Sequence, residues 1–188
     1  MERSPRGDAE FRRLYDEHFV AIRSYCLRRL PVADVNDAVA EVFLVVWRRI
    51  DEVPGGDDAA LWLYGIARNV VRNVERSERR RAHLFRRVLP FASAPEIDAE
   101  TVVVRNSEDS EVLEQLARLR PADQEILRLS IWEELTNTEI AELLGIDAHA
   151  ATMRLSRARN RLAGRLGMDK TPKRTRTDPQ PVGEGGRQ

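Results

Sequence analysis

The chain has little of what disulfide-stabilised proteins, zinc proteins and most enzymes depend on. Its single cysteine, Cys26, excludes an intrachain disulfide framework and a cysteine-based zinc site. Its three histidines are far apart in the sequence, so we expect no metal site, no cofactor and no histidine-dependent active site. The carboxylates are expected on solvated helix faces or in an acidic middle segment. A nuclease or another enzyme therefore has little support, and we expect the protein not to be an enzyme.

Long apolar runs are also absent. No apolar stretch approaches the roughly 18 residues that a membrane span needs, and residues 1–10 are charged and lack the apolar region of a signal peptide. We therefore expect a cytoplasmic protein without membrane insertion. The glycine pair at Gly55 and Gly56 is not followed by Lys-Ser or Lys-Thr, which excludes a nucleotide-binding P-loop.

Lysine is almost absent, and the cations, nearly all of them arginines, are unevenly distributed. Positive and negative side chains balance at 31 each, so the net charge says nothing about partners. Arginines crowd between residues 76 and 87, acidic residues dominate residues 96–114, and residues 148–166 contain no Asp or Glu. Two basic patches separated by acid indicate two nucleic-acid contacts and other surfaces that do not bind nucleic acid.

Residues 136–165 are predicted to form two short helices joined by a tight turn. Thr136 and Glu139 form a T-x-x-E capping box, in which each residue satisfies a free backbone donor at the start of a helix. Gly145 supplies the left-handed residue that ends this helix, and Asp147 can cap the next one. The second helix has an apolar face at helical spacing, made by Ala151, Leu155, Ala158 and Leu162. Arginines recur with the same period at Arg154, Arg157 and Arg161.

A helix, a glycine turn and a cationic second helix are typical of a helix-turn-helix that enters a DNA major groove. The alternative is a hairpin of two helices whose arginines only solvate a surface face. The acid-free run and the capped turn favour DNA.

Three helices with apolar faces are predicted before the acidic segment. The first ends near Leu30, before Pro31. The second is capped by Asp34 or Asn36 and reaches residue 50. The third covers about residues 59–81 and is preceded by a Pro-Gly-Gly loop.

The outward face of the third helix combines amides with arginines. Its members at helical spacing are Asn69, Arg72, Asn73, Arg76 and Arg80. Amides interleaved with arginines suit contact with base edges and phosphates together, although an ordinary solvated face has the same pattern. At the start of the helix, Trp62 either packs into the core or stacks on unpaired bases.

Residues 88–110 are read as a flexible linker, because they contain two prolines, small residues and acid. Fully extended, such a linker could span roughly 70 Å, so the two halves are expected to fold separately and need not touch. Beyond it, a helix over residues 111–119 is expected to face inward through Val112, Leu116 and Leu119. The next helix begins with Pro121, and its expected inward residues are Ile126, Leu127, Ser130 and Ile131.

We therefore expect an all-α fold with two small helical domains, residues 11–87 and 111–167. The linker over 88–110 joins them, and residues 1–10 and 168–188 are expected to be disordered because they are polar and poor in apolar anchors.

Six stretches together resemble the extracytoplasmic-function (ECF) group of bacterial RNA polymerase sigma factors. In the first domain they are FRRLYDEHF, DAVAEVFLVVWRR and LWLYGIARNVVRNVERSERRR. In the second they are LEQLARLRPADQEILRL, LTNTEIAELLGI and RLSRARNRL. They cover about residues 11–165 in the order and spacing of the family.

The resemblance implies a function and its partners: a subunit that binds core RNA polymerase, through the β′ clamp helices and the β flap, and recognises promoter DNA. Many members are controlled by an anti-sigma factor, so such a partner is an open expectation. The polymerase-binding residues would be Asp37, Glu41, Phe43 and Trp47. The −10 element would be bound by Trp62, Asn69, Arg72, Asn73, Arg76 and Arg80. The loop over 51–60 would capture a flipped base.

The −35 element would be recognised by the helix over 147–162, through His149, Thr152, Met153, Arg154, Arg157 and Arg161. The start of this helix departs from the family pattern Pro-x-Gly-Thr-Val-Lys-Ser-Arg. The usual Thr and Lys are replaced by Ala150 and Thr152, so the preferred −35 sequence does not follow from the resemblance.

The alternative function is a stand-alone helix-turn-helix transcriptional regulator. Such proteins usually bind palindromic sites as dimers, and a simple regulator has no need of the first domain. The first domain therefore favours the initiation subunit.

Overall fold

The computed structural model describes residues 5–56, 58–88 and 107–167. Within these ranges the chain forms seven α-helices, one short 3-10 helix and no strand, as the apolar periodicity predicts. The elements are α1 (Pro5–Leu27), α2 (Val32–Arg48), η1 (Ile50–Glu52), α3 (Asp58–Val88), α4 (Ser107–Ala117), α5 (Pro121–Ile131), α6 (Asn137–Leu144) and α7 (Ala148–Arg165). The expected linker over 88–110 and the expected disordered tail lie largely or wholly outside the described residues.

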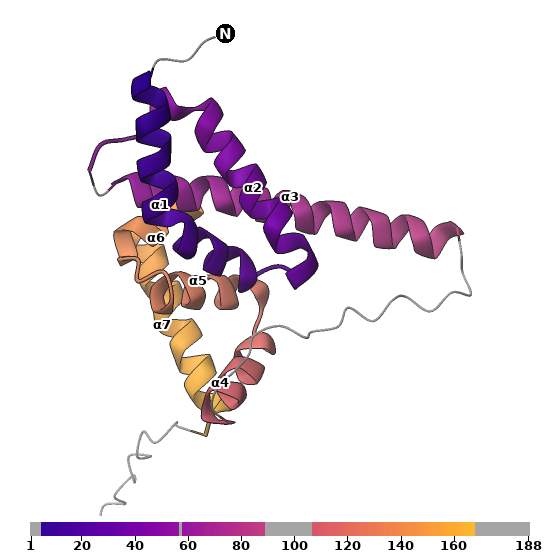
Figure 1. Cartoon of the computed structure of the whole chain (residues 1–188). Helices are drawn as coiled ribbons and strands as arrows, with labels where there is room; N and C mark the ends of the chain where they lie inside the picture. Colours follow the sequence, from indigo (N-terminus) through magenta and orange to yellow (C-terminus); the bar gives the residue numbers. More distant parts are fainter. Residues whose placement is uncertain (1–4, 57, 89–106, 168–188) are drawn as a thin grey trace, which may run out of the picture.

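The first bundle consists of α1, α2, η1 and α3 (Figure 1). Its core is built by apolar faces at helical spacing. The core side of α2 is formed by Val35, Ala38, Val39, Val42, Phe43 and Val46. The inner face of α3 meets it through Leu63, Ile66, Ala67 and Val70. Beyond this packed region the C-terminal part of α3 extends away from both bundles (Figure 1).

The ends of the first helices differ from the expectation. Residues 5–10 belong to α1 instead of being disordered, and Gly7 packs near Ile50 of η1. The helix stops at Leu27, so Arg28 and Arg29 lie in the turn that follows.

The predicted caps of α2 are wrong. Pro31 occupies the N-cap position with φ −55° and no side-chain hydrogen bond. Because the proline ring already fixes φ near the helical value, the helix begins at once. Asp34 then lies in the first turn, where its negative charge suits the helix dipole.

The second bundle consists of α4 to α7, with α7 in contact with each of the other three helices. Leu116, Leu119, Ile126 and Leu127 are buried as expected. Two residues that were expected to face inward are exposed: Val112 is 37% exposed and Ile131 is 49% exposed. Leu129 is fully buried instead, and Ile131 is the last residue of α5.

The predicted helix-turn-helix is confirmed in its local chemistry. The Thr136 backbone N–H donates to Glu139 Oε2 at 2.7 Å, and the Glu139 N–H donates to Thr136 Oγ1 at 3.3 Å. Gly145 has φ 66°, and Asp147 caps α7 by accepting from the Ala150 N–H at 2.8 Å. The apolar face of α7 is buried as predicted.

The two bundles lie side by side and touch, an arrangement that the length of the linker left open. Helices α3 and α6 are in contact, and Gly65 faces Leu143: a Cβ at Gly65 would lie 3.9 Å from Leu143 Cδ1. In the described part of the chain, no helix is both long and apolar enough to cross a membrane.

The first bundle should depend strongly on the inner face of α3. Leu63 is fully buried, so Leu63→Ala should lower the free energy of unfolding by about 2–5 kcal/mol, the usual cost of a lost core leucine and its cavity. Val20→Ala is the control, because Val20 is 72% exposed on α1. Urea unfolding followed by circular dichroism measures both, and equal losses would contradict the assigned core.

Candidate nucleic-acid interface

The outward face of α3 is exposed as predicted. The side chains of Asn69, Arg72, Asn73, Arg76 and Arg80 are all on the surface. They are held there because the opposite face of the same helix is packed against α1 and α2. The structure therefore presents amide and guanidinium groups together on one rigid helix.

A groove between α2 and α3 adds a feature that periodicity did not reveal. Asp34, Asp37 and Glu41 line it from α2, and Asn69 and Asn73 line it from α3. The sequence analysis had assigned these acids and amides to different partners. A phosphate is repelled by the acidic wall, whereas a base edge can accept and donate hydrogen bonds there.

Trp62 is half-buried against the core of the first bundle, so its ring is largely used for packing. The Arg49 guanidinium lies 5.5 Å from its ring centroid, a distance typical of a cation–π contact. Arg49 also forms an ion pair with Glu52 of η1. Trp62 and Arg49 thus connect the end of α2 to the start of α3, on either side of the Pro-Gly-Gly loop.

The α2 residues expected to bind polymerase divide into two groups. Asp37 and Glu41 are exposed. Phe43 is only 4% exposed and packs its ring against Tyr15 and other aromatic residues, so its assignment to a docking surface is corrected to a core role. Trp47 is half-buried with its ring 5.0 Å from that of Phe11.

Sequence reasoning missed Leu44 on this surface. Its side chain is 40% exposed although it is large and apolar. It follows Asp37 by two helical turns, which places both on one face of α2. The helical spacing was the signal that could have identified it.

The recognition helix α7 exposes most of its predicted contacts. His149, Met153, Arg154 and Arg157 are on the surface, and Met153 is 40% exposed. Thr152 is also exposed, but its hydroxyl donates to the Ala148 carbonyl at 2.9 Å and accepts from Asn137 Nδ2 of α6 at 3.1 Å. Thr152 therefore braces the two helices of the motif.

Arg161, which is expected to contact DNA, forms an ion pair within the second bundle. Its Nη1 donates to both carboxylate oxygens of Asp123, at 2.9 and 2.8 Å, and Asp123 is 5% exposed on α5. Arg159 similarly donates to Ser130 Oγ at 2.9 Å. These two arginines tie α7 to α5, so the basic face that remains for DNA is shorter than the sequence suggests.

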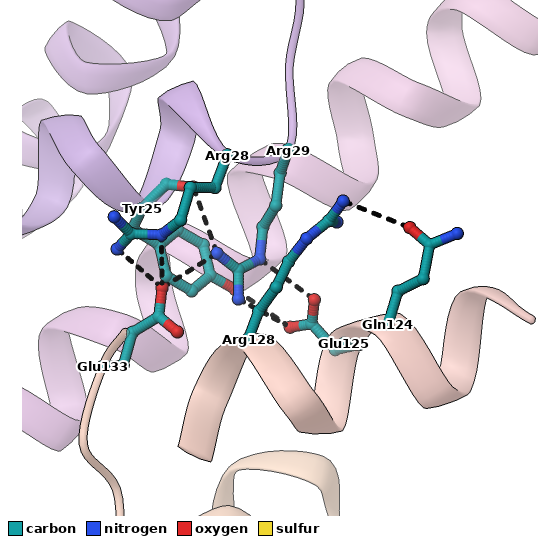
Figure 2. Close-up of polar contacts among 7 residues, drawn as sticks. All are labelled: Tyr25, Arg28, Arg29, Gln124, Glu125, Arg128 and Glu133. Carbon is teal, nitrogen blue, oxygen red and sulfur yellow. Dashed lines mark hydrogen bonds and ion pairs between the residues drawn. The ribbon is translucent and has the colours of Figure 1, made fainter. Parts of the chain in front are cut away.

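A buried polar cluster joins the two bundles (Figure 2). Arg28 and Arg29, in the turn after α1, donate to the same oxygen, Glu133 Oε1, at 2.9 and 3.0 Å. Arg29 also donates to Glu125 Oε2 at 3.0 Å, and the Tyr25 hydroxyl donates to Glu125 Oε1 at 3.4 Å.

The side chains of Arg29 and Glu133 are 3% and 0% exposed, and the Arg29 guanidinium lies 3.6 Å from the Tyr25 ring centroid. Burial by itself lowers the pKa of Arg29, but Tyr25, Glu125 and Glu133 outweigh it and raise the pKa, so Arg29 stays charged. Sequence reasoning missed this cluster entirely.

Among the described residues, no three His, Cys, Asp or Glu side chains are grouped so that they could hold a metal ion. Cys26 is fully buried in the core, and burial raises the pKa of its thiol to about 11.

Comparison with known proteins identifies both halves. The family model described as Sigma-70 region 2 matches residues 14–81, and the one described as Sigma-70, region 4 matches residues 109–162. The ECF RNA polymerase sigma factor BldN of Streptomyces coelicolor is 31% identical over 148 residues, which cover 77% of this chain and 56% of BldN. The ECF RNA polymerase sigma factor SigL of Mycobacterium tuberculosis is 29% identical over 154 residues, which cover 78% of this chain and 83% of SigL. The chain thus spans little more than half the length of BldN.

Solved structures share the fold. The sigma factor RpoE of Bartonella quintana, solved with the anti-sigma factor NepR, superposes with a TM-score of 0.64 at 20% identity, covering 85% of this chain and 98% of RpoE. CnrH, solved with the cytosolic domain of CnrY, gives 0.58 at 24% identity, covering 85% of this chain and 88% of CnrH.

The ion pair with Asp123 predicts that Arg161 mainly stabilises the fold, whereas the exposed Arg157 mainly binds DNA. Arg161→Ala leaves a buried carboxylate without its partner, so it should lower the free energy of unfolding by about 1–3 kcal/mol. Arg157→Ala should leave stability unchanged, because Arg157 is exposed. It should instead reduce the salt dependence of DNA binding by about one unit of slope. Thermal unfolding and a salt titration of duplex binding measure both variants, and the reverse pattern would overturn the assignment.

Proposed function

Because the chain belongs to the ECF group of bacterial RNA polymerase sigma factors, we propose that it is a dissociable initiation subunit. It directs core RNA polymerase to specific promoters and helps to open them. It catalyses no reaction of its own, and it functions in the cytoplasm. The first bundle acts as the −10 domain and the second as the −35 domain.

The observation that carries this proposal is the α3 face together with its groove. Asn69 and Asn73 line the groove opposite Asp37 and Glu41. A strand whose phosphates follow the arginine side of α3 can turn its bases toward these amides, each of which both donates and accepts hydrogen bonds. The arginines position the strand and the amides read it.

Promoter melting follows from differential binding. Bases can enter the groove only when they are unpaired, so their capture favours the open form of the DNA over the duplex. The energy for opening comes from these contacts and from the polymerase, and no covalent step is needed.

The −35 element is bound by the exposed part of α7. His149, Met153 and Arg154 lie near the helix start and act as base readers, and Arg157 contacts phosphate. Arg161 holds the helix on α5. Because Ala150 and Thr152 replace the usual contacts of the family, the preferred −35 sequence differs from that of relatives that keep them.

Polymerase docks on the outer side of α2. Asp37, Glu41 and Leu44 offer charge next to an exposed apolar side chain, a combination that suits a cationic helical partner such as the β′ clamp helices. The second domain contacts the β flap. RpoE and CnrH were solved with an anti-sigma factor and with the cytosolic domain of CnrY, respectively; a comparable inhibitory partner is proposed here.

The function as a whole is tested by runoff transcription with core polymerase on genomic fragments. The purified chain should produce discrete transcripts that core polymerase alone does not make. A chain that binds palindromic duplex DNA as a dimer and gives no transcripts with core polymerase would support the stand-alone regulator instead.

Charge reversal on α2 should weaken polymerase binding. Asp37→Lys combined with Glu41→Lys should lower affinity for core polymerase in a pull-down at moderate salt, because both acids are exposed on the proposed docking face. Asp16→Lys with Glu142→Lys makes the same charge change at two exposed acids elsewhere and should leave binding intact. If the first variant keeps its helical content and its affinity for core polymerase is unchanged, the docking assignment is wrong.

Single substitutions on α3 should distinguish residues that read bases from residues that contact the DNA backbone. Asn73→Ala should lose discrimination between matched and mismatched −10 sequences by about 1–3 kcal/mol, since an amide offers both a donor and an acceptor. Arg76→Ala should weaken all promoters alike and reduce the salt slope by about one unit. Open-complex formation on single-base promoter variants across a salt series measures both. If Asn73→Ala weakens every promoter equally, base reading does not occur on this face.

A further inference from the structure

The hydrogen bonds of α7 show which of its faces is left for DNA. Arg159 donates to Ser130 and Arg161 donates to Asp123, both on α5. These arginines mark opposite flanks of α7, because residues two apart lie about 200° apart around a helix. The stripe midway between the flanks lies opposite the buried face and is the outermost part of α7. We call it the outer stripe, and its members are His149, Met153, Ser156 and Asn160.

The outer stripe is unoccupied by contacts within the protein. All four side chains are exposed, and none of them forms a side-chain hydrogen bond or an ion pair within the described part of the chain. They can therefore meet DNA without first breaking a contact. Ser156 and Asn160 were not among the expected −35 contacts, because the sequence analysis followed the arginines.

The start of α7 is uncharged and carries one large apolar side chain. Residues 148–153 contain no Asp, Glu, Lys or Arg. In a helix-turn-helix, the N-terminal residues of the recognition helix contact base edges, so this uncharged section would lie deepest in the major groove. Every residue of α7 is described, and Met153, 40% exposed, is its only large apolar side chain on the surface.

The neighbouring Thr152 cannot supply a hydrogen-bond donor to a base. A threonine hydroxyl has one proton to donate, and Thr152 donates it to the Ala148 carbonyl at 2.9 Å. The same hydroxyl accepts from Asn137 of α6 at 3.1 Å. Guanine is read in the major groove by donors to its O6 and N7 atoms. At positions 152 and 153 the helix offers methyl groups to the groove and no such donor.

Thymine is the base that carries an apolar group in the major groove, its C5 methyl. We propose that Met153 reads a thymine of the −35 element through apolar contact with this methyl group, and so determines which base pair is preferred there. This inference rests on the proposed function. The unbranched thioether side chain adapts its shape to the surface that it meets, and contact removes two apolar groups from water. Arg157, on the phosphate, contributes affinity without this preference.

The test changes a single methyl group of the DNA. The holoenzyme, made of the full chain and core polymerase, is given a promoter that it transcribes. Each thymidine of the −35 region, on either strand, is replaced in turn by deoxyuridine. Uracil lacks the C5 methyl but keeps the base pairing and the O4 acceptor. Competition binding then gives the ratio of affinities for the thymine and uracil forms at each position.

With the wild-type chain, at least one replacement should lower affinity about two- to fourfold, as the loss of one buried methyl group predicts. Met153→Ala should bind the thymine and uracil forms equally at that position, and Met153→Leu, which stays apolar, should keep most of the difference. Ile131→Ala is the matched control, because Ile131 is an exposed apolar residue outside α7. It should keep the full difference. Arg157→Ala should weaken binding of both forms equally and leave their ratio unchanged.

Two results would overturn the proposal. One is a −35 region in which no thymine is sensitive to the replacement, and the other is a sensitivity that Met153→Ala retains with unchanged helical content. Failure of the proposed function looks different, because core polymerase and the chain would then give no transcript from any genomic fragment. In that case the same replacement is made in duplexes that the free chain selects from a random pool, and a chain that selects none also overturns the reading by Met153.

Discussion

The pairing of two arginines from the turn after α1 with Glu133, between α5 and α6, is the contact on which the arrangement of the molecule depends. Most helix contacts lie within one bundle or the other, and the bundles also meet through α3 and α6. What fixes one bundle against the other is a small set of buried charges beside the contact of Gly65 with Leu143. Such an interface is specific in geometry and modest in net stability, because the attraction of the charges is largely offset by the loss of their water.

The DNA-binding faces lie outside this contact. The amides and arginines of α3 and the exposed start of α7 are on the surface even while the bundles touch. Each face is therefore preformed. Arg161 and Thr152 act as braces that hold α7 in place on its own bundle.

Local features of the fold were predictable from the sequence because their causes are local. The capping box of Thr136, the left-handed Gly145 and the Asp147 cap depend on residues within one turn of each other. The exposed face of α3 followed from its period, and the resemblance supplied its role. The buried polar cluster between the bundles could not be predicted, since Arg29 and Glu133 are 104 positions apart and each looks like an ordinary surface charge in sequence. Ile131 was misplaced because periodicity locates a face but not the end of its helix, and the docking role of Phe43 came from the resemblance alone.

The central claim is that the outward face of α3 contacts the −10 element. The most direct measurement is crosslinking to promoter DNA from a photoreactive amino acid in place of Asn73, in a complex with core polymerase. The account predicts crosslinks to bases of the −10 element. Crosslinks confined to other parts of the promoter, in a complex active in transcription, would contradict it.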